Sequence, residues 1–397
     1  MKYLIVGNGV AGTTAAANIR KLDPEGEITI VTEEPYPFYS RIRLIEFLAG
    51  ETDGKGLRLR KDKWYEENRL RLILDTQVTG IENEKKRVTL SNGEGIPYDR
   101  LLLATGGVPH LPPIPGAGTK GVFALRTLRD AIAIREYAAG GKGVVILGGG
   151  VLGLEAGNAL RKAGSMVTVV EFLPRLLPRQ MDPEGAGILR ARMEGMGIGF
   201  HIGKNLKEIT GAGKVSGVVL QDDTKIDCAL VLLCCGIRPN AGLAEKLGLP
   251  VRKGIPVNDR METAVKDIYA AGDLIEHREV FYGIWPAAER QGETAGINMA
   301  GGTALYEGTV ISNTLKVVGI DLFAAGDIDP EGRRESIVFK DDDRHIYKKL
   351  VIGENRLGGA ILLGDLKDRA RLMKAIETKK DISGIRNQLR QWDLQSL

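Results

Sequence analysis

The amino-acid sequence predicts an α/β fold in which one structural unit occurs twice: a strand, a glycine-rich turn, a helix and a second strand. Residues 7–12 (GNGVAG) follow the apolar run 3–6, and residues 148–153 (GGGVLG) follow the apolar run 144–147. Residues 306–397 contain no such turn and read as mixed strands and helix. These observations predict two Rossmann-like domains, each with three ββα layers, and a C-terminal α+β domain.

The spacing of the glycines has a steric reason. The first permits a tight turn, the second lets backbone approach a pyrophosphate, and the third lets the helix pack closely on the strand. The pyrophosphate then lies on free N–H groups at the helix N-terminus. An acid that can bind a ribose ends each second strand: Glu33 or Glu34, and Glu171. A lone motif can be a turn without a ligand, but two copies in this context indicate two dinucleotides and electron transfer between them.

Composition and charge narrow the class of protein. The chain has 397 residues, 43% apolar and 27% charged, which is typical of a globular protein of two or three domains. A net charge of +4 does not indicate a nucleic-acid surface. We expect no membrane span, no signal peptide and a cytoplasmic location. Cys228, Cys234 and Cys235 form no C-x-x-C pair, so we expect buried thiols and no metal site.

The first unit continues beyond its glycine turn. The expected elements are helix 12–22, strand 27–32, a helix with Trp64 and Tyr65, antiparallel strands within 77–90 and a buried strand 101–104. Prolines at 109, 112, 113 and 115 then indicate a linker. We therefore expect the first domain to end near residue 110.

The second unit spans residues 143–171 and ends in Glu171. A carboxylate there favours NAD(H), because it repels the 2′-phosphate of NADP(H). Arg175 follows closely in the sequence, and its positive charge leaves binding of NADP(H) open as an alternative. Residues 231–240 mark the return toward the first domain.

A third strand followed by glycine, residues 268–273, ends in Asp273. This aspartate either holds the ribityl chain of a flavin or caps a helix. Pro286 begins a helix that runs through Met299, and its N-terminal amides suit the electron-rich edge of a flavin. Strands near 313–318 and 348–363 and a helix 366–378 follow. The expected domains are 1–110 with 240–305 (FAD-binding), 111–239 (NAD-binding) and 306–397 (C-terminal, α+β interface domain).

Several motifs together resemble the FAD-dependent pyridine nucleotide oxidoreductases with two dinucleotide-binding domains. The resemblance covers essentially the whole chain and is strongest to NADH:rubredoxin oxidoreductases and the FAD-containing part of assimilatory nitrite reductases. The motifs that carry it are residues 34–44, 104–106 (ATG), 153–155 (GLE), 235–240 (CGIRPN), 271–273 (AGD), 313–317 and 319–321.

The resemblance implies a role for individual residues. The FAD site would comprise the turn and the residues around the flavin: Gly7, Gly9, Val10, Ala11, Gly12, Glu33 or Glu34, Arg41, Val78, Ala104, Thr105, Gly106, Asp273, Trp285 and Pro286. Arg41 would lie against the pyrophosphate or flavin, and the backbone of Val78 would face the adenine. The NADH site would comprise Gly148, Gly150, Val151, Leu152, Gly153, Glu155, Glu171 and Gly236. No catalytic residue is assigned firmly; Glu155 and Lys316 are candidates near the flavin.

The departures from the family pattern are informative. Disulfide-reducing relatives carry a reactive cysteine shortly after the second strand, whereas residues 40–46 here contain none. Ferredoxin-reductase relatives have a lysine where Glu46 stands, and it pairs with the glutamate that matches Glu155. Lys316 is either a replacement for that charge or a surface lysine.

The resemblance therefore implies an oxidoreductase, a flavoprotein that passes electrons from NADH through FAD to an external carrier such as rubredoxin. The basic helix 366–380 is either a docking face for an acidic redox protein or a merely solvated surface. The alternatives are an NADH oxidase, the FAD component of a nitrite reductase, or a flavin-binding interaction protein that NADH switches. The sequence leaves the oligomeric state open.

Overall fold

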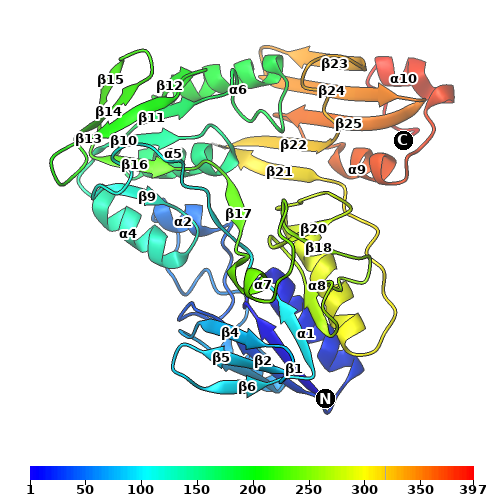
Figure 1. Ribbon diagram of the computed structural model, residues 1–397. Coiled ribbons are helices and arrows are strands. Elements are labelled where there is room, and N and C mark those ends of the chain that lie inside the picture. Colours follow the sequence, from blue (N-terminus) through cyan, green and yellow to red (C-terminus); the bar gives the residue numbers. More distant parts are fainter. Residues whose placement is uncertain (318) are drawn as a thin grey trace. The chain divides into compact units, whose positions relative to one another are not determined.

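A computed structural model describes residues 1–317 and 319–397 (Figure 1). The chain forms two compact units. The first contains residues 1–43, 53–110 and 236–309, and the second contains residues 44–52, 111–235 and 310–397. Among the described residues, no helix is both long and apolar enough to cross a lipid bilayer.

A parallel five-stranded sheet forms the centre of the first unit, in the order β19-β7-β1-β2-β3. Its strands are β1 (Lys2–Val6), β2 (Glu27–Val31), β3 (Leu70–Ile73), β7 (Arg100–Leu103) and β19 (Ile268–Ala270). The helices are α1 (Val10–Leu22), α3 (Asp62–Glu67), α7 (Gly242–Lys246) and α8 (Trp285–Met299). The smaller strands are the antiparallel set β4 (Val78–Glu82), β5 (Arg87–Leu90) and β6 (Gly95–Pro97), and the pairs β8 (Gly107–Pro109) with β17 (Ile237–Pro239) and β18 (Ile255–Val257) with β20 (Ile275–His277).

The alternation of side chains along β1 explains the layers. Tyr3 and Ile5 lie in one buried cluster with residues of α1 and α8, whereas Leu4 and Val6 lie in another with residues of β4, β5 and β6. The parallel sheet is therefore covered by helices on one face and by a small antiparallel sheet on the other. This is the predicted ββα arrangement.

The second unit repeats this plan around a parallel sheet in the order β12-β11-β10-β16-β9. These strands are β9 (Val122–Ala124), β10 (Gly143–Leu147), β11 (Met166–Glu171), β12 (Gly199–Ile202) and β16 (Leu230–Leu233). The antiparallel layer is β13 (Leu206–Thr210), β14 (Gly217–Leu220) and β15 (Lys225–Asp227). The helices are α2 (Leu44–Leu48), α4 (Leu128–Ala138), α5 (Val151–Lys162) and α6 (Pro183–Gly195).

Residues 310–397 form an antiparallel sheet in the order β21-β22-β25-β24-β23 with helices beside it (Figure 1). Its elements are β21 (Ser312–Val317), β22 (Ile320–Gly326), β23 (Glu335–Asp341), β24 (Ile346–Gly353), β25 (Arg356–Leu363), α9 (Arg369–Glu377), the 3₁₀ turn Ser383–Ile385 and α10 (Arg386–Arg390). The helix expected over 366–378 begins later, at Arg369. The α/β fold class with an additional C-terminal α+β part is confirmed.

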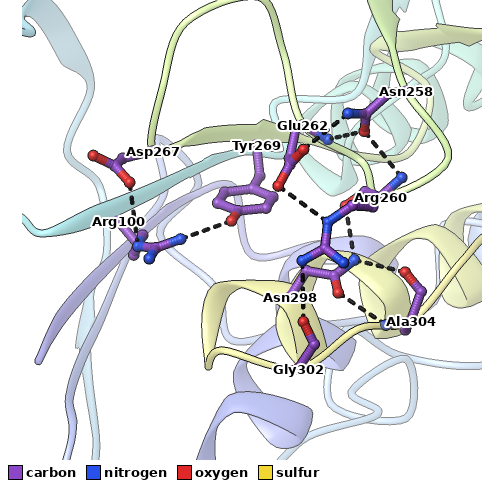
Figure 2. A network of polar contacts seen from close by, with 9 residues as sticks. All are labelled: Arg100, Asn258, Arg260, Glu262, Asp267, Tyr269, Asn298, Gly302 and Ala304. Atoms are coloured by element: carbon purple, nitrogen blue, oxygen red, sulfur yellow. Dashed lines mark hydrogen bonds and ion pairs between the residues drawn. The ribbon is translucent and has the colours of Figure 1, made fainter.

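A network of polar contacts lies at the N-terminal ends of the parallel strands in the first unit (Figure 2). Arg100, the first residue of β7, donates to the Tyr269 hydroxyl at 2.8 Å and pairs with Asp267 at 3.4 Å. Near the end of α8, the Asn298 amide donates to the carbonyls of Arg260 and Ala304 at 2.9 and 2.8 Å. Ligands of open α/β sheets bind at the opposite, carboxyl ends of the strands, so this network has a structural role.

Helices α1 and α8 cross with almost no space between their backbones. A Cβ atom at Gly292 would lie 2.4 Å from the Ala11 carbonyl oxygen, and one at Gly296 would lie 2.5 Å from that of Ala15. Both distances are far below van der Waals contact. Glycine at these two positions therefore sets the distance between the helices.

We predict that Gly296→Ala destabilises the chain by about 1–3 kcal/mol, because the added methyl forces the two helices apart. The matched control is Gly187→Ala on α6, where a Cβ atom would meet none of the described atoms within 4 Å. This control should raise stability by up to about 1 kcal/mol, through helix propensity alone. Thermal unfolding midpoints of both variants check the prediction, and a similar shift in both would contradict it.

Candidate functional site

The first glycine turn leaves one position open. Gly7 has φ +116°, and a Cβ atom there would lie 2.1 Å from the Ala104 carbonyl oxygen. A Cβ atom at Gly12 would lie 2.0 Å from the Gly7 carbonyl oxygen. At Gly9, the N-cap of α1, a Cβ atom would meet no atom of the described residues within 4 Å. The protein itself therefore requires glycine at positions 7 and 12, whereas position 9 faces free space.

The second turn has the same geometry. Gly148 also has φ +116°, and its Cβ atom would lie 2.5 Å from the Cys234 carbonyl oxygen. A Cβ atom at Gly153 would lie 2.0 Å from the Gly148 carbonyl oxygen, and one at Gly150 would meet nothing within 4 Å in the part of the chain that the structure describes. Neither α1 nor α5 has an acidic residue in its first turn. Both N-termini are thus open to an anionic group such as a pyrophosphate.

Glu171 lies beside the second turn, as the sequence predicts. One carboxylate oxygen accepts the Gly149 N–H at 2.6 Å and the other accepts the Leu173 N–H at 2.7 Å. Its side chain is buried among its own neighbours. Arg175 donates to the backbone carbonyls of Met181 and Pro178 at 3.1 and 3.2 Å. The guanidinium is thereby held within its own loop.

The acids of the first unit differ from Glu171. The Glu34 carboxylate pairs with Arg41 at 2.5 Å and accepts the Tyr39 hydroxyl, whereas Glu33 is exposed. Arg41, which we expected at the pyrophosphate or flavin, is thus engaged by Glu34. Which acid binds a ribose stays a prediction.

The carboxyl ends of β1, β7 and β19 lie at one edge of the sheet, which places residues 7–12, 104–106 and 271–273 together. The Thr105 hydroxyl donates to the Asn240 carbonyl at 2.8 Å, and the Gly272 N–H donates to the Gln291 side chain at 2.9 Å. Asp273 follows directly. Of the other candidates, Trp285 and Pro286 begin α8, and Val78 is buried at the start of β4.

Sequence reasoning missed Asn8, which lies inside the first turn. Its side chain is buried, and its oxygen accepts the Tyr65 hydroxyl at 3.0 Å. Its amide nitrogen has no hydrogen-bond partner among the described residues. A buried amide donor without a partner is rare, and beside an open N-cap it fits a ligand that supplies the acceptor. Its position within the glycine motif was the available signal.

Glu155 lies in the first half of α5. Burial raises the pKa of its carboxyl to about 7. The side chain of Lys316, the other candidate near the flavin, lies outside the described part of the chain, although its backbone pairs with Asp321. Gly236 (φ +91°) belongs to the first unit, where its carbonyl accepts the His110 N–H at 2.9 Å.

The cysteines have the character of structural thiols. All three cysteines are free; Cys228 is buried as expected, whereas Cys234 and Cys235 follow the end of β16 and are partly exposed. Burial raises the pKa of each thiol, for Cys228 and Cys235 to about 11. They are therefore uncharged at neutral pH and poor nucleophiles. Among residues 1–317 and 319–397, no cluster of His, Cys, Asp and Glu could hold a metal ion.

Two ββα units, each with a glycine turn open at its second glycine, define a protein with two dinucleotide-binding sites. Residues 1–292 match the family model described as pyridine nucleotide-disulphide oxidoreductase, and residues 312–380 match the rubredoxin NAD+ reductase C-terminal domain. The chain belongs to the pyridine nucleotide-disulphide oxidoreductase family.

Named relatives place the chain more closely. It is 39% identical over 384 residues to a nitrite reductase [NAD(P)H] of Bacillus subtilis, covering 96% of this chain and 48% of that protein. It is 33% identical over 389 residues to the NADH-rubredoxin oxidoreductase of Clostridium acetobutylicum, covering 97% of this chain and 96% of that protein. The chain thus spans about half the length of the nitrite reductases it matches.

Solved structures of related reductases are similar to this chain over nearly its whole length. The NADH:rubredoxin oxidoreductase of Clostridium acetobutylicum has a TM-score of 0.82 and 30% identity, with 97% of each chain covered. The covalent putidaredoxin reductase–putidaredoxin complex has a TM-score of 0.88 and 27% identity, covering 96% of this chain and 94% of that chain.

We predict that Glu155→Gln changes how stability depends on pH. The pKa of Glu155 lies near 7 in the folded chain against an ordinary value of 4.5, so the folded chain binds more protons between these pH values. Stability of the parent therefore falls as pH rises through this window. The glutamine variant lacks this loss and should be more stable than the parent at pH 8, by at most about 3 kcal/mol.

Thermal unfolding of parent and variant from pH 5 to pH 8 measures this effect. Glu136→Gln on α4 makes the same chemical change at an exposed position and serves as the comparison variant. A difference between Glu155→Gln and the parent that does not change with pH would show that the Glu155 carboxyl is not held in a dry site.

Proposed function

We propose that this chain is an NADH-dependent flavoprotein reductase that passes electrons from NADH through FAD to a small external electron-transfer protein such as rubredoxin. The observation that carries the proposal is the pair of glycine turns with an open second position, in a chain whose three cysteines are free thiols with a raised pKa. Two nucleotides can bind, and no reactive dithiol takes the electrons onward.

The first unit holds FAD. The N–H groups at the start of α1 and the open position at Gly9 receive the pyrophosphate, and Asn8 donates its unpartnered amide. Asp273 accepts the ribityl hydroxyls, and the N-terminus of α8 at Trp285 and Pro286 stabilises the electron-rich edge of the ring. FAD supplies the chemistry when bound, because it accepts a hydride and releases electrons singly. The residues of the first unit therefore need only bind the FAD and orient it.

The second unit holds NADH. Gly150 and the N-terminus of α5 receive the pyrophosphate, and the Glu171 carboxylate accepts from the adenosine ribose. Its negative charge repels a 2′-phosphate. Arg175 cannot compensate, because backbone carbonyls of its own loop already bind the guanidinium. NADH is therefore preferred over NADPH.

The acceptor is a carrier protein with an acidic surface. Of the basic side chains expected to form a docking face over 366–380, two are bound internally: Arg371 donates to the Leu394 carbonyl and Lys380 to that of Ser396. The exposed cations that remain include Arg369, Lys374 and Lys379. The C-terminal domain model and the relatives named after rubredoxin and putidaredoxin support such a partner. The proposal includes a cytoplasmic location for the protein, because its reductant would be NADH.

The strongest alternative is electron entry for nitrite reduction. The 39% identity to a nitrite reductase [NAD(P)H] of Bacillus subtilis, of which this chain covers 48%, supports this alternative. An NADH oxidase relative of Methanocaldococcus jannaschii, 34% identical over 342 residues, keeps direct oxygen reduction as a third possibility. The division into FAD-binding (1–110 and 240–305), NAD-binding (111–239) and C-terminal (306–397) domains stays a proposal.

Stopped-flow absorbance of the FAD-loaded chain tests the proposed function. NADH should bleach the flavin rapidly, and rubredoxin should reoxidise it much faster than oxygen or nitrite does. Fast reoxidation by oxygen alone would identify an oxidase. A reduced flavin that persists with every acceptor would contradict the reductase and favour an interaction protein switched by NADH.

We predict that Glu171→Gln lowers the preference for NADH over NADPH by about tenfold, because the charge that repels the 2′-phosphate is gone while an oxygen acceptor remains. The ratio of kcat/KM for the two nucleotides measures the preference. Arg175→Met is the matched control in the same loop and should leave the ratio unchanged. A parent that already prefers NADPH, or a loss of NADPH activity in Arg175→Met, would contradict this assignment.

A further inference from the structure

The loop of residues 172–182, between β11 and α6, closes back on the second glycine turn. Its Leu177 N–H donates to the Gly149 carbonyl at 3.0 Å, while the Gly149 N–H donates to the Glu171 carboxylate at 2.6 Å. Leu176 and Leu177 are fully buried. The turn, the acid and the loop therefore form one hydrogen-bonded assembly.

The far end of this loop contacts the C-terminal sheet. The Met181 N–H donates to the Leu177 carbonyl at 2.8 Å, and Asp182 follows as the N-cap of α6, accepting the Gly185 N–H at 3.0 Å. The second oxygen of Asp182 accepts the Tyr347 hydroxyl at 2.5 Å and pairs with the Lys349 ammonium at 3.1 Å. One carboxylate thus joins the loop, α6 and β24.

The contact on β24 is buried and tightly packed. Tyr347 and Lys349 are 0% and 3% exposed, and the Lys349 ammonium also donates to the Asp329 carbonyl at 3.0 Å. The Tyr347 ring lies against Gly185, where a Cβ atom would come within 3.0 Å of it. A buried charge without its partner costs several kcal/mol, so this arrangement strongly prefers a single geometry.

We propose that Tyr347 and Lys349 are positioning residues for the nucleotide in the second unit. Their side chains fix the position of the Asp182 carboxylate, and Asp182 fixes the end of the loop 172–182. The loop in turn keeps Gly149 and Glu171 in the geometry that binds the adenosine half of NADH. A binding site needs a supporting shell that is itself locked by packing and hydrogen bonds. The inference rests on the proposed function, because it takes the second turn as the NADH site.

The chain offers a matched control one residue away. Lys348 is 5% exposed and pairs with Asp365 at 2.6 Å, so it is buried and paired like Lys349. Neighbouring residues of a strand point to opposite faces, and the Lys348 ammonium is directed to Asp365 and not to Asp182. Lys348→Met therefore removes a comparable ion pair from the same strand without touching Asp182.

Steady-state kinetics of the FAD-loaded chain, with NADH varied and ferricyanide as acceptor, test the proposal. Tyr347→Phe and Lys349→Met should each raise KM for NADH about tenfold with kcat nearly unchanged, because binding geometry is lost and the reacting groups are not. Lys348→Met should leave KM within about twofold of the parent. The pair Asp182→Asn with Lys349→Met keeps a helix cap, removes the unpaired charge and should recover part of the loss.

Tyr347→Phe keeps the ring packing, so it tests the contact even if Lys349→Met does not fold. Equal KM values in parent and Tyr347→Phe, or equal changes in Lys348→Met and Lys349→Met, would overturn the inference while leaving the proposed function intact. A parent that neither binds NADH in a fluorescence titration nor oxidises it would overturn the proposed function, and the inference with it.

Discussion

The close contact between each helix that follows a glycine turn and the turn itself is the constraint on which both nucleotide-binding units depend. At Gly12 and at Gly153 a single added carbon would lie 2.0 Å from a carbonyl oxygen of the same turn. This contact brings the N-terminus of the helix to the end of the central strand. In the first unit the same helix then meets α8 with equally little space, so the turn, α1 and α8 are fixed together.

The two units share this frame but differ in how they hold their acids. Glu171 is buried and accepts two backbone N–H groups, whereas Glu34 is engaged by the side chains of Arg41 and Tyr39. An acid fixed by backbone is part of the fold, while an acid fixed by side chains can exchange partners when a ligand arrives. In the second unit the backbone thus already fixes the acid, and the loop that follows it is hydrogen-bonded to the glycine turn.

Local patterns were enough to predict the ββα units, because the glycine spacing and the apolar runs act over a few residues. The same patterns located Glu171 beside its turn. They could not show that Arg175 is bound by its own loop, since that depends on the path of residues 175–181. Nor could they show the contact of Asp182 with Lys349, which joins residues far apart in the sequence. Asn8 was visible within the motif, but its unpartnered amide depends on burial.

The three glycines of each motif are required for different reasons. Backbone contacts within the protein demand the first and the third, so their loss would harm every copy of this fold, whatever it binds. No described residue demands the second, at Gly9 or Gly150, where a Cβ atom would meet no described atom within 4 Å. A descendant that kept the architecture but gave up a nucleotide would be free to change that glycine alone. The residue at the middle position of each turn would therefore distinguish descendants that still bind the nucleotide from descendants that keep only the fold.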